Sequence, residues 1–505
     1  MDSGNVSLTD IALKATILNF ELLEKEVKYL KSDMDDMFLV FCAIITSFMQ
    51  VGFASLEAGF VNSKNVTNII LKNVLDSFIC AIFYWLIGFS LAYSQGNKFL
   101  GYSGWAGTDI PYDKYSFWVF EFVFASTAST ILSGAVAERC SFITYMAYSS
   151  IISGVVYPIA SHWAWSSQGW LSRDLHYQDM AGCGVVHALG GSCAFVAAVF
   201  LGPRIGRFQD GRPVDKPGHS MSMVGVGGLI LISGFLGFNA GALGRVSGQG
   251  PALGRVIQNT VMGGSGAGVS MLLMSRLGMV GERVWAFATT LNAVIAGMVA
   301  VCGAVDQYTP LMSLATGAGG CLVFLVVRNL VMKFQVDDPL DAVAVHFGGG
   351  FFGVIAGPLF TPNGLIYGVT DESIRQSKYH IFSSKLRNNV LGGAAIVTWS
   401  VLCSILLFGS LPAIGFFSGY PKNEKEEIQG LDVSKHKEPA YPVKGWVIDF
   451  PVQVQQNNGL RKNGSYTLNR SEDGEFIMIG PHVTKTVSRR RSSLDFYSAP
   501  NPFIP

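Results

Sequence analysis

The sequence contains the run Asp179-Met-Ala-Gly-Cys-Gly-Val-Val-His187-Ala-Leu-Gly-Gly191 and, later, the run Asp341-Ala-Val-Ala-Val-His346-Phe-Gly-Gly-Gly350. Both are hydrophobic, and both follow the pattern Val-His-x-x-Gly-Gly. An ionisable side chain inside a membrane helix indicates a functional site, and two in matching contexts predict one site built from two halves of a duplicated chain. Imidazole is also the side chain that exchanges protons near neutral pH.

The composition predicts an all-α integral membrane protein. Half of the 505 residues are apolar and 14% are charged, whereas a soluble domain carries about 25% charged residues. A bilayer-crossing helix needs about 20 apolar residues. By that criterion the chain has eleven candidate transmembrane helices: 37–59, 69–94, 117–136, 142–165, 180–201, 220–243, 256–275, 284–303, 310–331, 342–360 and 391–417.

The basic residues predict the orientation, because cytoplasmic loops are enriched in Lys and Arg. The basic loops alternate with poorer ones and contain Lys64, Arg139, Arg204, Arg207, Arg212, Lys216, Arg276, Arg283, Arg328 and Lys333. We therefore expect a multi-pass plasma-membrane protein with an extracellular N-terminus and a cytoplasmic C-terminus. Residues 361–390 are an exception, since this outer loop is also basic.

The N-terminal segment, residues 1–36, lacks the features of a cleaved signal peptide. Residues 8–31 have the spacing of an amphipathic helix, and a surface helix is favoured over a coiled coil because the segment is short. Asn5-Val-Ser7 is an N-glycosylation sequon on the expected outer side.

Neither the cysteines nor the glycines indicate a cofactor. No Cys-x-x-Cys pair occurs, so buried, inert thiols are expected rather than a disulfide framework or a metal site. The glycine-rich runs lack the lysine of a phosphate-binding loop and are expected to let helices pack closely. The sequence therefore predicts no cofactor and no nucleic-acid partner.

Several ordered runs together resemble the ammonium transporter family, which comprises the Amt, Mep and Rhesus-type proteins. The resemblance covers about residues 37–441. The matching runs are Leu56-Glu-Ala-Gly59, Phe120-Glu-Phe-Val-Phe124-Ala125, Gly134-Ala-Val-Ala-Glu138-Arg139, His162-Trp-Ala-Trp165, the His187 run, Gly237-Phe238-Asn239-Ala-Gly241 and Asp337-Asp-Pro-Leu-Asp341 with the His346 run.

The resemblance implies a fold and an activity. Helices 1–5 and 6–10 would be inverted repeats, the eleventh helix would wrap the bundle, and residues 37–418 would form this transporter domain. Three subunits would assemble, each with its own pore. The activity would be ammonium transport, with methylammonium as an analogue, and not enzymatic catalysis.

The resemblance also implies site residues. Trp165, Phe124 and Phe238 would attract the ammonium cation through their ring faces at an outer site. The two phenylalanines would stack as a gate, and His187 and His346 would share a proton and line an apolar lumen beyond it. Ammonium would lose its proton there, so that neutral ammonia crosses, with or without the proton.

Three further residues belong to the predicted substrate site: Phe120, Glu121 and Asp179. Many relatives have Trp where Phe235 stands, a Ser where Ala242 stands, and Gln where Glu121 stands. Glu121 therefore either faces the outer vestibule or is paired at a subunit contact. Asp179 would orient the loop and helix ends near the outer site without binding substrate directly, and Asp341 would have a similar role in the second half. Capping of the helix end alone is the alternative for both.

The tail divides into two predicted parts. Residues 419–445 resemble the Amt tail that docks under a neighbouring subunit, and Ser434 lies in a run where plant-type relatives carry a threonine that can be phosphorylated. Residues 446–505 have little apolar periodicity, which predicts disorder. The tail and Trp165 favour an Amt-type member over a Rhesus-type ammonia or gas channel.

Two hypotheses of another class remain open on the sequence alone. Paired membrane histidines can be the axial ligands of a haem oxidoreductase, which would show a Soret band. An ammonium sensor would use the same residues with transport secondary.

Overall fold

The computed structural model describes residues 8–411 apart from 109, 363, 365 and 367–371, and residues 424–442. It also describes the backbone of three strands between 467 and 487, and for residues 10 and 372–382 the backbone alone. The Asn5 sequon lies outside the described residues. The chain divides into two compact units, residues 1–437 and residues 438–505.

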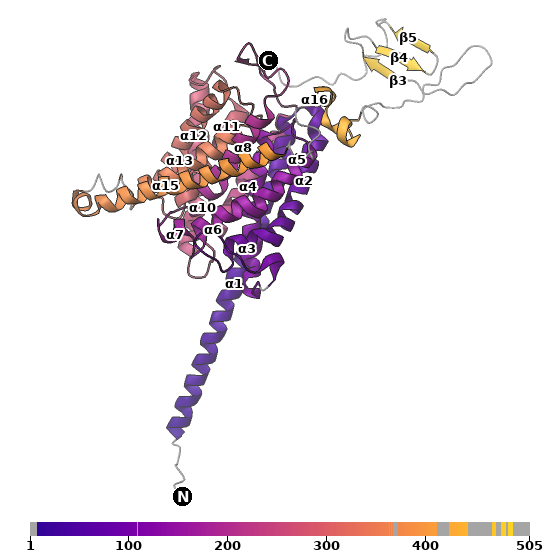
Figure 1. Cartoon of the computed structure of the whole chain (residues 1–505). Coiled ribbons are helices and arrows are strands. Elements are labelled where there is room, and N and C mark those ends of the chain that lie inside the picture. Colours follow the sequence, from indigo (N-terminus) through magenta and orange to yellow (C-terminus); the bar gives the residue numbers. More distant parts are fainter. Residues whose placement is uncertain are drawn as a thin grey trace, which may run out of the picture. The chain divides into compact units, whose positions relative to one another are not determined.

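The first unit is almost entirely helical (Figure 1). Among the described residues, ten helices are long and apolar enough to cross a membrane. They are α1 (Leu8–Phe60), α2 (Val66–Phe83) with η2 (Tyr84–Gly88) and α3 (Phe89–Tyr93), α4 (Tyr115–Ala135), α5 (Phe142–Ile151) with η5 (Ile152–Val156) and α6 (Tyr157–Trp165), η6 (Cys183–Ala188) with α8 (Leu189–Leu201), α9 (Met221–Gly241), α11 (Phe287–Val301) with η7 (Cys302–Ala304), α12 (Pro310–Lys333), η8 (Val343–Gly348) with α13 (Gly349–Phe360), and α15 (Glu372–Ser410). The prediction of an all-α membrane fold is thus confirmed.

The predicted span 256–275 corresponds to α10 (Gly250–Leu277), which is long enough to cross a bilayer but less apolar than the other ten. Its face toward α11 and α12 is made of small residues that let the backbones approach. The ideal Cβ of a residue at Gly317 would lie 1.9 Å from the carbonyl oxygen of Gly263. The count of eleven spans stays a prediction.

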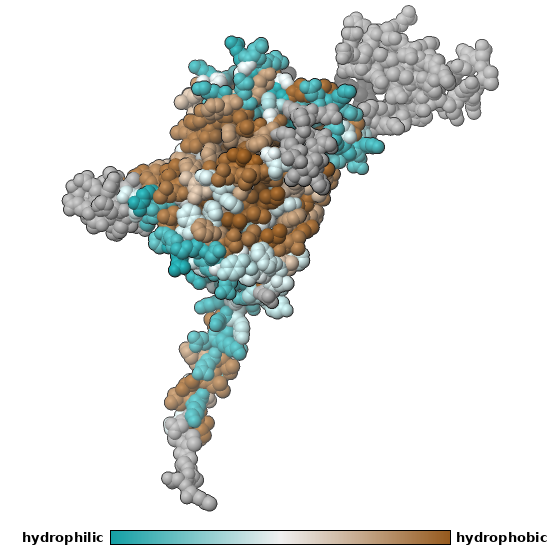
Figure 2. Space-filling model, in the orientation of Figure 1, coloured by the Kyte–Doolittle hydropathy of each residue, from teal (hydrophilic) through white to brown (hydrophobic). Residues whose placement is uncertain are grey.

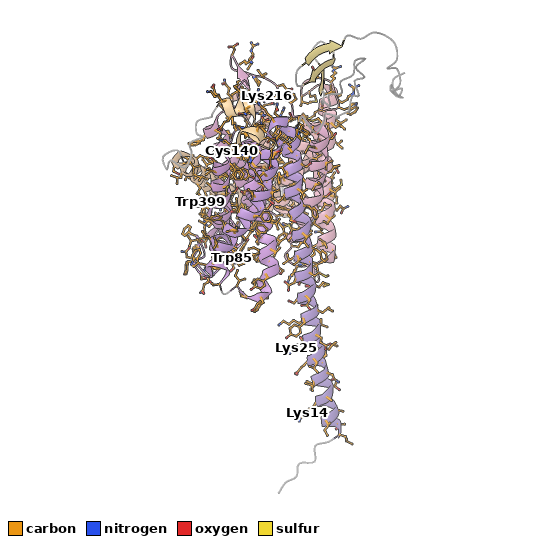
Figure 3. The ribbon with its side chains drawn as sticks, turned by 90° about the vertical axis from the view of Figure 1, so that its right-hand side faces the viewer. Lys14, Lys25, Trp85, Cys140, Lys216 and Trp399 are labelled. Atoms are coloured by element: carbon orange, nitrogen blue, oxygen red, sulfur yellow. The ribbon has the colours of Figure 1, made fainter. Side chains whose placement is uncertain are left out.

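On the face shown in Figure 2, apolar surface forms a band across the helices, with hydrophilic surface at both ends. We call one of these ends the basic end; it is formed by the loops 61–65, 136–141, 202–220 and 334–342. Figure 3 shows Cys140 and Lys216 toward this end and Trp85 toward the other.

A cluster of charged side chains joins three of these loops at the basic end. Arg204 contacts Glu138 at 2.6 Å and Asp337 at 2.8 Å, and Arg207 contacts Asp337 at 3.3 Å. Burial would raise the pKa of the Asp337 carboxyl, but its bonds to Arg204 and the charge of Arg139 hold it at about 2. Asp337 therefore stays ionised and fixes the loop that precedes η8.

Helix α1 differs from the prediction. The spacing predicts a short surface helix at 8–31, whereas α1 continues without a break from Leu8 into the membrane-spanning part (Figure 1). No Gly or Pro stands between residues 31 and 37 to end the helix. Figure 3 places Lys14 and Lys25 on the part of α1 that extends beyond the other helices.

The remaining elements are short. They are α7 (Trp170–Arg173), the hairpin β1 (Phe208–Gln209) and β2 (Arg212–Pro213), α16 (Glu424–Gln429) and η9 (Asp432–His436), with single turns η1 (Ser63–Asn65), η3 (Trp105–Gly107) and η4 (Tyr112–Lys114). Helix α15 packs against α8 and α13. This contact fits the wrapping role predicted for the last span.

The second unit contains an antiparallel sheet of β3 (Thr467–Arg470), β4 (Phe476–Gly480) and β5 (Val483–Val487). Thr467 pairs with Ile479, and Phe476 pairs with Val487. These strands depart from the disorder predicted for 446–505. The cause is local, because Val, Ile, Thr and Phe favour strands even where a segment has little apolar periodicity overall.

Candidate substrate pathway

The two halves of the chain bring their histidines into direct contact. His187 lies in the π-helical turn η6 before α8, and His346 lies in the π-helical turn η8 before α13. The two Nδ1 atoms are 3.2 Å apart, and the ring centroids are 5.3 Å apart at an angle of 19°. Both side chains are buried. One ring nitrogen can donate to the other, which leaves each Nε2 for another partner.

The same geometry bears on the haem hypothesis. The rings touch each other, so no macrocycle fits between them and the pair cannot hold one iron from two sides in this arrangement.

Phenylalanine rings cover one side of His187. Phe124 from α4 and Phe238 from α9 stack with centroids 4.0 Å apart and an interplanar angle of 22°. Phe238 lies 5.5 Å from His187, and Phe235 lies 5.6 Å from it. Rings stacked this closely are in van der Waals contact, so no water fits between Phe124 and Phe238.

Trp165 ends α6 and lies beside Phe124. Its ring centroid lies 5.9 Å from that of Phe124, and its indole nitrogen donates to the Asp179 carbonyl at 2.7 Å. Phe120 packs against Phe124 at 4.7 Å. The structure thus brings together the predicted aromatic residues, and the half-buried Trp165 is held by the backbone of Asp179.

The Asp179 carboxylate caps the turn that holds His187. It accepts from the backbone N–H groups of Cys183 at 2.7 Å, Gly184 at 2.8 Å and Val185 at 3.1 Å, and from the Tyr177 hydroxyl at 3.3 Å. Burial raises the pKa of the Asp179 carboxyl, and these donors work against that rise. Asp179 therefore positions His187 without touching it.

In the second half the capping residue is not the one expected. Asp338 accepts from the Val343 N–H at 2.7 Å, whereas Asp341 pairs with Arg328 at 2.9 Å. Asp341 adopts a φ of 59°, a left-handed conformation that Asp tolerates better than most residues. The run has three aspartates within one turn of each other, and spacing alone does not distinguish among them.

Glu121 is buried inside the subunit. Its carboxylate accepts from the hydroxyl of Tyr93 at 2.7 Å and from that of Tyr157 at 3.2 Å. Tyr93 in turn contacts the Ser161 hydroxyl at 2.7 Å. Glu121 was expected either to face the outer vestibule or to be paired at a subunit contact. It is paired, but its partners are two tyrosines of its own chain.

His346 also lines a small cavity. Its volume is about 30 Å³, enough for about two water molecules, and its lining is mainly apolar. It also contains Glu57, which accepts from Asn73 at 2.7 Å and from Ser133. Glu57 is absent from the predicted site residues. An acidic residue inside the span 37–59 was the signal that could have found it.

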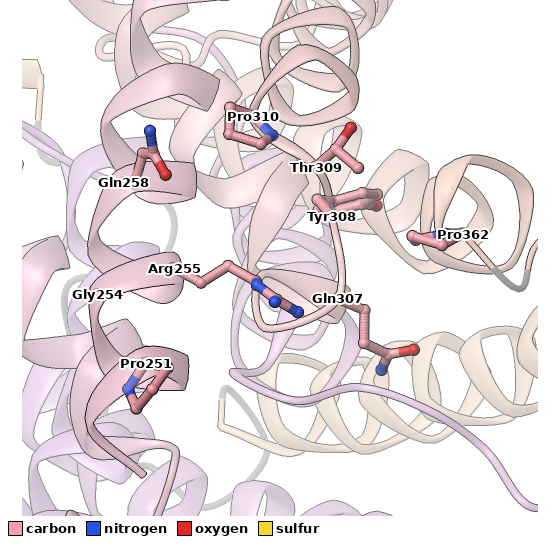
Figure 4. Close-up of a pocket in the computed structure, with 9 residues that line it drawn as sticks. All are labelled: Pro251, Gly254, Arg255, Gln258, Gln307, Tyr308, Thr309, Pro310 and Pro362. Atoms are coloured by element: carbon pink, nitrogen blue, oxygen red, sulfur yellow. The ribbon is translucent and has the colours of Figure 1, made fainter.

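A larger pocket lies elsewhere, between the start of α10 and the loop that precedes α12 (Figure 4). Its volume is about 660 Å³, and Arg255 extends across it from α10 toward Gln307. None of the predicted substrate residues lines it. The lining residues are Pro251, Gly254, Arg255, Gln258, Gln307, Tyr308, Thr309, Pro310 and Pro362.

The tail docks on the N-terminus of α2 in the same chain. Asp432 accepts from the backbone N–H groups of Thr67 at 3.1 Å and Asn68 at 2.8 Å, and Lys64 donates to the carbonyl oxygens of Glu427 and Ile428 at 2.8 Å each. The resemblance had implied docking under a neighbouring subunit. A helix N-terminus offers free N–H groups and a partial positive charge to Asp432, which explains the contact within the chain.

Ser434 lies inside this docked turn. Its side chain is half-buried, and its hydroxyl oxygen is buried with no hydrogen-bond partner among the described residues. The adjacent Asp432 is 1% exposed, so there is little solvent at this point of the contact.

Comparisons with known proteins agree with this architecture. Residues 37–441 match the model of the Ammonium Transporter Family. The chain is 37% identical to "Putative ammonium transporter 1" of Caenorhabditis elegans over 94% of its own length and 91% of the relative's. It is 32% identical to "Ammonium transporter Amt2" of Archaeoglobus fulgidus, covering 84% and 92% of the two chains.

Solved structures share the fold. A protein titled "Sensor Amt Protein" superposes with a TM-score of 0.73 at 31% identity, covering 81% of this chain and 99% of that one. Mep2 of Candida albicans superposes with a TM-score of 0.67 at 23% identity, covering 76% and 85% of the two chains, which shows the common fold.

Proposed function

Because the chain belongs to the ammonium transporter family, we propose that it moves ammonium across a membrane through the pathway between Trp165 and the Glu57 cavity. The observation that carries this proposal is the 3.2 Å contact between the ring nitrogens of His187 and His346 beneath the Phe124–Phe238 stack. Growth of a transporter-deficient strain on low ammonium, together with uptake of labelled methylammonium, tests it.

The proposed mechanism begins at Trp165. The faces of Trp165 and Phe124 attract a cation, and partial loss of its water strengthens that attraction. Displacement of the stacked phenylalanines then admits the ion to His187. The histidine pair accepts a proton from ammonium, so that neutral ammonia enters the apolar passage, and the pair then releases this proton either back to the outer side or onward to the inner side. Sodium and potassium have no proton to give up and stay excluded.

Placement in the cell is also a proposal. The basic end would be cytoplasmic, because its loops hold most of the Lys and Arg residues and the tail docks there. The N-terminus would then be extracellular and Trp165 would face the outer side. The membrane would be the plasma membrane, and three subunits would assemble, each with its own pathway.

We expect Trp165→Leu to weaken binding of methylammonium and so to raise the half-saturating concentration of its uptake. The loss of binding free energy should be about 1–2 kcal/mol, the value of a partly desolvated cation–π contact. Dose–response curves at equal surface abundance measure it. Trp163→Leu is the matched control, because Trp163 bonds to the Phe99 carbonyl and packs on Trp170 and Trp399, away from the stack. Equal curves for both variants would place the outer site elsewhere.

The tail is proposed to regulate transport through Ser434. A phosphate would add about 1.5–2 negative charges beside the buried Asp432, in a space that holds only a hydroxyl group. Repulsion and the cost of burying charge should release the tail from α2.

We therefore expect Ser434→Asp to lower uptake without lowering surface abundance. Ser434→Ala should transport normally, because it keeps the turn and adds no charge. Truncation after Tyr441 should also leave uptake largely intact, since the docked contacts precede that residue. Uptake assays with surface labelling decide this, and normal activity of Ser434→Asp would disprove regulation through this contact.

A sensor function is the second candidate, favoured by the likeness to the solved "Sensor Amt Protein". Transport would then be secondary. Failure of the wild-type chain to restore growth or methylammonium uptake, with the protein present at the surface, would favour the sensor.

A further inference from the structure

The extended part of α1 carries a regular apolar seam. Apolar side chains recur at alternating intervals of three and four residues from residue 13 to residue 51, with one threonine among them. This is the heptad spacing that makes one helix pack along another. The positions are Leu13, Thr16, Phe20, Leu23, Val27, Leu30, Met34 and Met37, followed by Phe41, Ile44, Phe48 and Val51.

No part of the same chain that the structure describes covers this seam. Its apolar members are between 39% and 68% exposed, from Leu13 to Val51. Thr16 does not interrupt it, because its hydroxyl donates to the Ala12 carbonyl at 2.9 Å. In the helix the eight positions from 13 to 37 therefore form a continuous strip on a segment that is otherwise solvent-exposed.

A second apolar stripe, the one noted in the sequence as amphipathic, lacks this continuity. It includes Ile11, Leu18 and Leu22 but meets Lys25 at the next heptad position. The strip from Leu13 to Met37 has no charged residue at any seam position, so it is the face of α1 suited to a helical partner.

A partner helix must run in a direction, and lie at a depth relative to the membrane, that bring its apolar residues against the seam. Copies of this chain cross the membrane with the same topology, so their α1 helices run parallel at the same depth. Identical seam residues then meet layer by layer without any adjustment of register. A seam that continues into the membrane-spanning part of α1, through Phe41 to Val51, favours this partner over a soluble protein.

The charges beside the seam also fit a parallel copy. Glu26 precedes the seam residue Val27, and Lys31 follows it by four positions. In a parallel coiled coil these two flanking positions of neighbouring helices face each other, which sets Glu26 of one copy against Lys31 of the next. An antiparallel partner would not produce this pair.

We propose that residues 13–37 form a parallel coiled coil with the same segment of the other copies in the complex. This coil holds the subunits together beyond the membrane and takes no part in moving ammonium. It requires self-association, but not the substrate pathway proposed above.

Cysteine cross-linking on intact cells tests the coil. Leu23→Cys and Leu30→Cys place a thiol in the seam, and Lys25→Cys and Ser32→Cys place one on the opposite face two residues away. The native cysteines do not interfere, because seven are buried and Cys403 is half-buried. Mild oxidation should convert most of each seam variant into disulfide-linked dimers on non-reducing gels, and little of either control.

Cross-linking of the controls as strong as that of the seam variants would overturn the proposal, as would its absence from both seam variants. A second variant, Leu23→Asp with Leu30→Asp, should lower the temperature at which the detergent-solubilised oligomer dissociates, while uptake per surface molecule stays within about twofold of wild type. An unchanged dissociation temperature would also overturn the coil. If the wild-type chain shows no uptake, that result contradicts the transport proposal and does not affect the coiled-coil proposal.

Discussion

Methylammonium uptake should fall by about 100-fold or more when His187 or His346 is replaced by Ala, while the protein still reaches the cell surface. Positioned groups that transfer protons typically contribute two to four orders of magnitude. Each replacement also leaves the partner nitrogen without its bond at 3.2 Å, in a site where both rings are buried. Discrimination against potassium should weaken with it, because the remaining space can admit water.

His162→Ala is the matched control for this experiment. His162 is equally buried, but both of its ring nitrogens contact backbone carbonyls, those of Ala92 and Asn97 at 2.7 Å each. Its loss should reduce the amount of folded protein and leave the selectivity of the remainder unchanged. Uptake and selectivity at wild-type levels in both His187→Ala and His346→Ala would refute the histidine mechanism.

Asp179→Ala should destabilise the protein by about 3 kcal/mol or more. Three backbone N–H groups, those of Cys183, Gly184 and Val185, would lose their acceptor in a buried position, at about 1–3 kcal/mol each. The turn that carries His187 should loosen first, so uptake per folded molecule should fall as well. Thermal unfolding followed by size-exclusion chromatography measures the first effect, and uptake assays measure the second.

Two other replacements calibrate the result for Asp179. Asp179→Asn keeps one carbonyl oxygen and should fall between wild type and Asp179→Ala. Asp174→Ala removes an exposed ion pair with Lys98, which contributes at most about 1 kcal/mol. If Asp179→Ala unfolds at the same temperature as Asp174→Ala, the carboxylate does not hold the turn.

The sequence predicted most of the membrane fold because hydropathy is averaged over about 20 residues per span, which tolerates local irregularity. It could not place features that depend on a single turn. The π-helical turns around His187 and His346 are made of residue types that also form ordinary α-helix, so residue type does not predict these turns. The choice of Asp338 over Asp341 as the cap depends on the backbone conformation of one residue.

The site was predictable in its residue types but not in its contacts. The matching Val-His patterns indicated that His187 and His346 meet. The rise per residue along a helix does not predict how their two rings are oriented. The partners of Glu121 also could not be predicted from the sequence. Its partners Tyr93 and Tyr157 lie 28 and 36 residues away along the chain, so no local pattern connects them.

The contact between Phe124 and Phe238 has an electrical consequence. Two rings with centroids 4.0 Å apart leave no standing column of water between them, so on the proposed route hydrated ions would have no resting conductance. A cell could then accumulate many copies of this protein without lowering its membrane voltage. The number of copies, and not the opening of any one of them, would set how fast a starved cell gathers nitrogen.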